Sequence, residues 1–172
     1  MSDTRNQGIE LLLTGMRNQH AVENQAISLL SRQVERLENY PEMAARMRQH
    51  IDESRMQAQR LEELLTGLGS SHSALKDVGL SLTGNMAALM HTVAPDEVVK
   101  NSFANYAFEH FEIAAYKSLL TLSDATGQTS GKTALEQSLS EEVAMAEWIN
   151  QHLADTTLRY LQRLNSGLKA GV

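Results

Sequence analysis

Apolar side chains recur every three or four residues through the first forty positions of the sequence. The row begins at Ile9 and continues in these steps to Leu37, which is the spacing that places side chains on one face of an α-helix. It predicts one long helix at about residues 5–38. We expect a tight turn at Asn39-Tyr40-Pro41, because proline cannot continue a helix but suits the first turn of the next one.

Three further apolar rows predict helices at about residues 41–66, 96–126 and 130–164. Glycines at 67, 69 and 127 stand where the first and second of these three helices should end. Between them, residues 67–95 carry short apolar pieces broken by glycine, which predicts a long crossover with one or two short helices. We expect the tail, residues 165–172, to fray.

Two helical hairpins joined by one long crossover are typical of ferritin-like four-helix bundles. Strand-forming runs are scarce and prolines number only 2, so the predicted fold class is all-α. A chain of 172 residues without a shift in composition is expected to form a single domain over residues 1–172.

Composition excludes several classes of function. The chain has 15 basic against 21 acidic residues, a net charge of −6, which disfavours nucleic acid as a partner. No apolar run approaches the roughly 20 residues of a membrane span, and the N-terminus does not read as a leader, so we expect a soluble, cytoplasmic protein without a membrane partner. Cysteine is absent, so any metal must be held by carboxylate, imidazole or carbonyl groups.

Acidic side chains interrupt the apolar row of every long helix. Glu53 follows Glu23 by 30 residues and Glu142 follows Glu112 by the same number, with the midpoints beside the predicted turns. Each pair should therefore lie level across its hairpin, about 22 Å from the turn. The crossover can bring both levels together at mid-bundle, with Glu109 as a possible fifth acid.

A cluster of carboxylates with one or two imidazoles suits iron, manganese or magnesium. For each acid the alternative is a boundary position whose carboxylate reaches solvent. The flanking polar residues have similar alternatives: His20 and His50 are either ligands or hydrogen-bonded core histidines, and Tyr116 either donates to a carboxylate or packs. We assign His20, Gln57 and Tyr116 to the surroundings of the site rather than to the ligands.

At these residues the sequence resembles the ferritin-like YciE/YciF family of bacterial stress-associated proteins. The likeness rests on three segments: His50-Ile-Asp-Glu-Ser, Glu109-His-Phe-Glu-Ile-Ala-Ala-Tyr116 and Leu139-Ser-Glu-Glu142. The family resembles rubrerythrin and other di-iron carboxylate proteins, which implies two iron ions, or manganese, in the bundle core. Carried over residue by residue, it implies Glu23, Glu53, Glu112 and Glu142 as ligands, with Glu109 and His50 as additional candidates.

The sequence departs from the usual di-iron pattern, which puts Glu-x-x-His on two helices. Met56 follows Glu53 by three and Met145 follows Glu142 by three, while Arg55 stands where a shifted reading would need histidine. Three outcomes stay open: a site unusually rich in carboxylates, a site that recruits His20 or His50 from the opposite flank, or a metal-free remnant held by hydrogen bonds.

Three functions follow from these alternatives. The first is a di-metal oxidase that oxidises Fe(II) or handles dioxygen or peroxide in a stress response. The second is a non-enzymatic stress-response bundle with a degenerate or weak metal site, and the third is a scaffold whose partner binds residues 70–95. Because such bundles commonly pair, we expect a homodimer.

Overall fold

Four α-helices make up the described part of the chain in a computed structural model, which covers residues 2–70 and 97–170. They are α1 (Ser2–Val34), α2 (Pro41–Gly67), α4 (Glu97–Thr126) and α5 (Lys132–Asn165). Each lies within a few residues of a helix expected from the apolar rows. The predicted short helices of the crossover fall almost wholly within residues 71–96, outside the described part.

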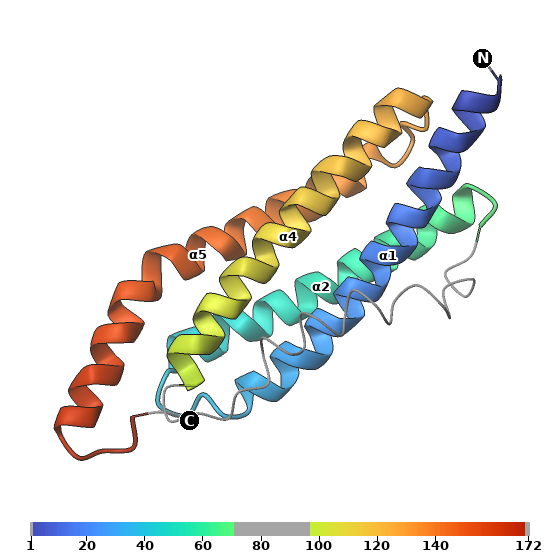
Figure 1. Cartoon of the computed structure of the whole chain (residues 1–172). Coiled ribbons are helices and arrows are strands. Elements are labelled where there is room, and N and C mark those ends of the chain that lie inside the picture. The colour runs from blue at the N-terminus through green and yellow to red at the C-terminus, as the bar shows by residue number, and fades with distance from the viewer. Residues whose placement is uncertain (1, 71–96, 171–172) are drawn as a thin grey trace.

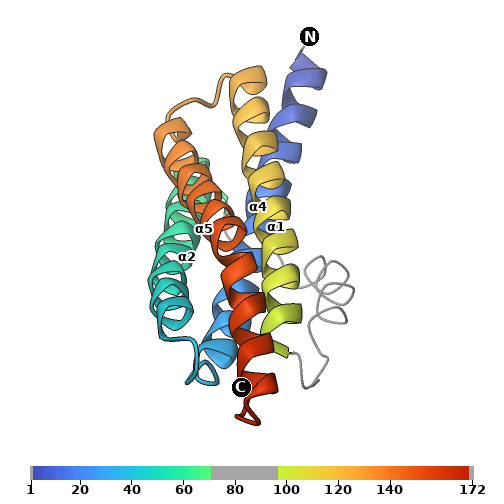
Figure 2. The same cartoon turned by 90° about the vertical axis from the view of Figure 1, so that its left-hand side faces the viewer.

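The helices form two antiparallel hairpins, α1 with α2 and α4 with α5, that pack side by side along their length (Figure 1). In the turned view α1 lies beside α4, and α2 lies beside α5 (Figure 2). The end of α2 and the start of α4 lie at opposite ends of the bundle (Figure 1). Two hairpins arranged in this way are typical of a ferritin-like fold, and the predicted all-α four-helix bundle is confirmed.

Helix α1 ends at Val34 rather than near residue 38. The chain then forms a turn with backbone hydrogen bonds between residues three apart, from Leu37 N to Val34 O (3.3 Å) and from Tyr40 N to Leu37 O (3.1 Å). This turn buries both Leu37 and Tyr40 in the core. The row of apolar residues therefore extends beyond the end of the helix, into the turn. The prediction that Pro41 opens α2 is right.

Glycine ends two helices in the way the sequence predicts. Gly69 and Gly127 both have a φ of +71°, in the left-handed region that glycine adopts without strain. The following amide then turns back onto the helix, as Ser70 N does to Leu65 O at 2.8 Å and Gln128 N to Ser123 O at 3.0 Å.

The tail does not fray over residues 166–170. Tyr40 Oη donates a hydrogen bond to the carbonyl of Ala170 (2.7 Å), and Arg163 Nε donates to that of Lys169 (2.8 Å). Arg163 also donates to Asn39 Oδ1 at 2.6 Å. The expectation of a frayed tail was wrong for residues 166–170, because Tyr40 and Asn39, in the first turn, are brought to the tail and to Arg163 only by the fold; residues 171–172 lie outside the described part.

The core has two main apolar clusters, one toward each end of the bundle. One, near the first turn, includes Leu30, Met47, Ile51 and Ile149, and the other includes Leu12, Leu61, Leu119 and Leu135. Between them every helix carries buried polar side chains, beside a smaller apolar cluster of Val22, Ala26 and Phe108. Within the described residues no helix has the length and apolar character that a bilayer crossing requires.

Candidate metal centre

Every helix contributes buried polar side chains to the layer between the two apolar clusters. These are Gln19 and Glu23 from α1; His50, Ser54 and Gln57 from α2; Glu109 and Glu112 from α4; and Ser138 and Glu142 from α5. All are almost fully inaccessible to solvent. The predicted convergence of acids from both hairpins at mid-bundle therefore occurs, although Glu53 lies at its edge.

Four of these residues form a compact group. Each of His50, Glu109, Glu112 and Glu142 offers one ligand atom, and the four atoms all lie within 4.8 Å of one another. His50 Nε2 lies 3.1 Å from Glu109 Oε2 and 3.6 Å from Glu142 Oε2. Donors this close together, with one imidazole among three carboxylates, suit a hard divalent cation.

The second nitrogen of His50 faces Glu53. His50 Nδ1 lies 2.9 Å from Glu53 Oε2, while Arg46 and Gln49 also donate to this carboxylate, at 3.0 and 2.7 Å. Glu53 is only partly buried and is not a member of the group of four. When Nδ1 donates its proton to Glu53, the lone pair of Nε2 points to the remaining three acids.

Glu23 lies next to the group and is held by two neutral donors. Tyr116 Oη donates to its Oε1 at 2.6 Å, and Gln19 Nε2 donates to the same oxygen at 2.9 Å. Gln19 also donates to Glu112 Oε1 at 3.2 Å, so it links Glu23 to the group. Of the two alternatives for Tyr116, the hydrogen bond to a carboxylate is the one observed.

Sequence reasoning missed Gln19. It precedes Glu23 by four residues and follows Leu12 by seven, so it lies on the same face of α1 as both. This spacing was a usable signal, but the predicted row followed His20 instead. In the structure His20 Nε2 lies 2.8 Å from Oε1 of Glu62, whose side chain is 44% exposed.

Two further predicted residues have clear positions outside the group. Gln57 Nε2 donates to Glu141 Oε2 at 3.0 Å, and Arg60 binds both oxygens of Glu141 from α2, at 2.7 and 3.0 Å. Arg55 is exposed and pairs with Asp52 at 2.5 Å. The positive charge of Arg55 therefore lies outside the group of four.

Burial and mutual repulsion change the protonation of the acids in the metal-free protein. Burial raises the pKa of Glu23 to about 7, against the hydrogen bonds from Tyr116 and Gln19 that lower it. Burial, followed by the charges of neighbouring glutamates, raises the pKa of Glu112 well above its usual value, and burial with the charge of Glu109 does the same for Glu142. Bound protons thus neutralise part of the negative charge that these carboxylates would carry in the metal-free protein.

The pKa values of His50 and Glu53 shift so that the charged form of each side chain is favoured, in contrast to the buried acids. Burial alone lowers the pKa of His50, but the Glu109 charge and the bond to Glu53 outweigh it and hold the pKa well above its usual value. Partial burial tends to raise the pKa of Glu53, yet the hydrogen bonds from His50 and Arg46 lower it to about 2. The two residues form an ion pair at the edge of the cluster.

The unsatisfied polar atoms gather around the group of four. Buried atoms without a hydrogen-bond partner among the described residues include both oxygens of Glu142, one oxygen each of Glu23, Glu109 and Glu112, and His50 Nε2, whose approach to Glu109 lacks hydrogen-bond geometry. Each such atom costs free energy when it is buried alone. A divalent cation would satisfy these oxygens and this nitrogen together, so the residues present fit a metal centre.

Comparisons with known proteins agree with this architecture. Residues 8–162 match the family described as DUF892, a domain of unknown function. A structure of a protein from Xanthomonas campestris pv. campestris has 30% sequence identity and a TM-score of 0.78, and the match covers 92% of this chain and 99% of that one.

Two more distant structures share the fold. The Escherichia coli stress protein YciF has 16% identity and a TM-score of 0.70, over 86% of this chain and 95% of its own. YcfI of Rhodopseudomonas palustris, described as a candidate structural protein, has 22% identity and a TM-score of 0.66, over 83% and 92%. The predicted resemblance to the YciE/YciF proteins is confirmed, and the chain belongs to the DUF892 family.

Proposed function

We propose that this bundle binds two iron or manganese ions in its core and oxidises Fe(II) with dioxygen or hydrogen peroxide. The observation that carries the proposal is the gathering of unsatisfied carboxylate oxygens around His50, Glu109, Glu112 and Glu142. Three acids at such short range repel one another in a core that excludes water, and bound cations remove that cost. Oxygen-rich donor sets favour iron and manganese over softer metals.

In this proposal His50 supplies the imidazole ligand that a Glu-x-x-His motif provides in the usual di-iron pattern. It precedes Glu53 by three residues, the reverse of the usual Glu-x-x-His order. Glu53, first expected to be a ligand, instead accepts the proton of Nδ1 and so orients His50 Nε2 toward the metal. Glu109, Glu112 and Glu142 complete the first ion's donors, and the free oxygen of Glu23 is available to a second ion.

The chemistry that bound iron supplies is one electron from each Fe(II). Hydrogen peroxide takes up two electrons and two protons and becomes two water molecules, so two ions match one peroxide. The chain's own part is to hold the ions in a site without water and to keep protons close by. Tyr116 holds one at its Oη, 2.6 Å from Glu23.

Anaerobic addition of Fe(II) to chelator-treated protein tests the proposal by elemental analysis. We expect about two ions per chain, and Fe(II) oxidation faster than in buffer once the oxidant is added. Glu142→Gln should lose both properties. Glu141→Gln is the matched control, because Glu141 is the adjacent residue but its oxygens bind Arg60, Gln57 and Gln137. If the wild-type chain binds no metal, or if both variants behave alike, the proposal fails.

A second candidate is a non-enzymatic bundle whose acids share protons instead of binding metal. The hydrogen bonds of Glu23 to Tyr116 and Gln19 favour it, as does the raised pKa of Glu23, Glu112 and Glu142. The description of YcfI agrees with it, and that of YciF suggests a stress role for either candidate. Fe(II) oxidation above the buffer rate that Glu142→Gln abolishes would reject it.

We further propose that residues 1–172 form a single domain and that the protein is a homodimer in the cytoplasm. Light scattering on the purified full chain measures the mass of the particle. A mass of one chain at micromolar concentration would reject the dimer without affecting the metal centre.

A further inference from the structure

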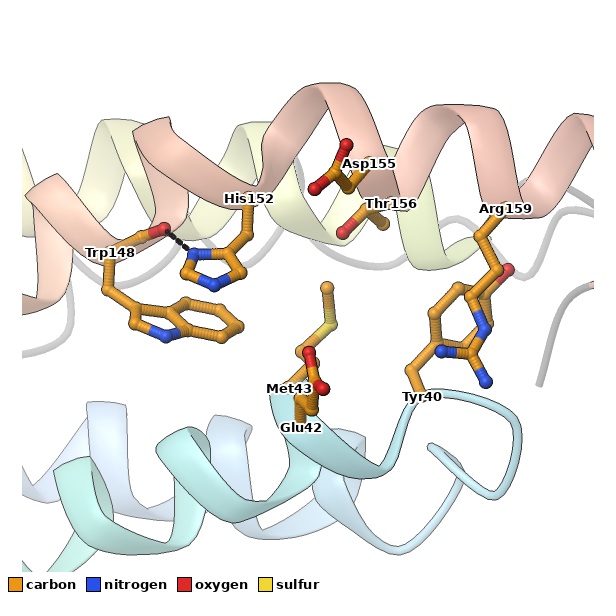
Figure 3. A pocket seen from close by; sticks show the side chains of 8 residues that line it. All are labelled: Tyr40, Glu42, Met43, Trp148, His152, Asp155, Thr156 and Arg159. Atoms are coloured by element: carbon orange, nitrogen blue, oxygen red, sulfur yellow. Dashed lines mark hydrogen bonds between the residues drawn. The ribbon is translucent and has the colours of Figure 1, made fainter.

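A surface pocket of about 70 Å³ opens between the start of α2 and the second half of α5 (Figure 3). Glu42 and Asp155 on its rim are exposed to solvent. Met43 extends from α2 toward α5, between His152 on one side and Arg159 on the other (Figure 3). The pocket thus leads from solvent to the interior side of α5.

A smaller cavity of about 10 Å³ lies beside this pocket, lined by residues of α2, α4 and α5. The two share four lining residues, Met43, Trp148, His152 and Thr156, so only these side chains lie between them. A volume of this size holds about one water molecule. Hydrogen peroxide is larger than water, so it and other small molecules pass only when the methionines that line the cavity move aside.

The inner cavity ends close to the candidate metal centre. Three of its lining residues lie one helical turn from a member of the group of four: Met47 precedes His50 by three, Met145 follows Glu142 by three, and Asn105 precedes Glu109 by four. One turn of helix is about 5.4 Å. The surface pocket and the inner cavity, which we call the passage, therefore reach from the surface to residues one helical turn from the cluster.

Asn105 gives the cavity a chemical preference. The residue is 5% exposed, and its Nδ2 donates to Gln33 Oε1 on α1 at 2.9 Å. Its Oδ1 is buried and has no hydrogen-bond partner among the described residues. Because Nδ2 is committed to α1, the carbonyl oxygen is the part of the amide left to accept a hydrogen bond from a molecule in the cavity.

We propose that this passage delivers hydrogen peroxide to the bundle core and that Asn105 Oδ1 is its last binding position before the cluster. Peroxide is small and uncharged, and it donates O–H hydrogen bonds; dioxygen has no hydrogen to donate. A hydrated cation would lose its water among methionine, tryptophan and isoleucine side chains. The destination of the peroxide rests on the proposed function, whereas the passage itself does not.

The first experiment needs no metal, because three methionines report on peroxide directly. Met16, Met47 and Met145 are equally inaccessible, at 2%, 2% and 1% exposure, but only the last two line the cavity. Peroxide oxidises a thioether to a sulfoxide: one peroxide oxygen binds the sulfur, the O–O bond breaks, and the other oxygen leaves as water. Chelator-treated full-length protein is exposed to peroxide, and mass spectrometry follows each methionine.

We expect Met47 and Met145 to oxidise several-fold faster than Met16. Two variants should slow them: Asn105→Leu removes the acceptor, and Thr156→Ile narrows the section that both cavities share. Asn101→Leu is the control, because Asn101 is also on α4 but donates to Glu97 and does not line the cavity. Equal rates at all three methionines, or rates that neither variant changes, would overturn the proposal.

The second experiment uses iron-loaded protein and compares the two oxidants. In Asn105→Leu the KM for peroxide should rise about fivefold, the factor of one neutral hydrogen bond, while the rate with dioxygen stays unchanged. An equal effect on both oxidants would overturn the preference for peroxide. If the chain binds no iron at all, the proposed function fails, and the methionine rates still decide whether the passage exists.

Discussion

Replacing Glu23 with glutamine should stabilise the metal-free protein at pH 8 by about 3 kcal/mol. Burial raises the pKa of Glu23 from an ordinary 4.5 to about 7, and each pH unit between the two values corresponds to about 1.4 kcal/mol. The side chain is fully buried, with 0% exposure, so solvent does not screen this cost. Glutamine keeps an oxygen that can accept the hydrogen bonds of Tyr116 and Gln19.

The sign follows from which state binds the proton. Below pH 4.5 Glu23 is protonated in both the folded and the unfolded chain, so its ionisation has no effect on stability. Between pH 4.5 and about 7 the unfolded chain ionises while the folded one keeps its proton, and stability falls. Above pH 7 the whole cost persists, and Glu23→Gln removes it.

Urea unfolding followed by circular dichroism, at pH 5 and pH 8 with a chelator present, measures the difference. The gain at pH 5 should stay below about 1 kcal/mol, since little of the cost has accrued there. Glu53→Gln should have the opposite sign at pH 8, because hydrogen bonds from His50 and Arg46 lower the pKa of Glu53 to about 2. A gain for Glu23→Gln that is equal at both pH values, or absent at pH 8, would refute the reasoning.

Three other substitutions test the contacts around the site and the fold. Tyr116→Phe removes the 2.6 Å donor to Glu23; we expect the pKa of Glu23 to rise above 7, measured by carboxyl NMR, and about 2 kcal/mol less stability at pH 8 than wild type in urea unfolding. Leu61→Ala, at a position with 0% exposure, should cost about 2–5 kcal/mol in the same assay. Tyr40→Phe removes the bond to Ala170; it should cost about 1 kcal/mol and speed trypsin cleavage of the tail, and unchanged cleavage would show that the bond does not hold it.

Periodicity and a few punctuating residues predicted most of the fold. The apolar rows, Pro41 and the glycines at 69 and 127 encode local backbone preferences, which act between neighbours in the chain. The same locality limited the prediction where distant segments meet. The anchored tail depends on a contact between distant segments, that of Tyr40 with Ala170, and the turn after α1 buries Leu37 and Tyr40 in a core made by other helices as well.

The candidate site shows the same division. The face of each helix and the level of each acid along it follow from spacing alone, so Glu23, Glu53, Glu112 and Glu142 were predicted to converge, with Glu109 as a possible fifth acid. Which atoms meet depends on helix packing and rotamers. Packing turned Glu53 outward to Arg46 and His50 inward to Glu109, and it gave Gln19 a role that the predicted row had assigned to His20.

The sequence by itself therefore determined that acids from α1, α4 and α5 would enter the core of one bundle, because a 3.6-residue period fixes the direction of a side chain from its own helix. Only the tertiary structure decided that one imidazole and three carboxylates form the compact group, with a methionine-lined cavity one turn away. Both features are made by side chains that are far apart in the chain. Their distances are set by how the hairpins pack, which no local pattern records.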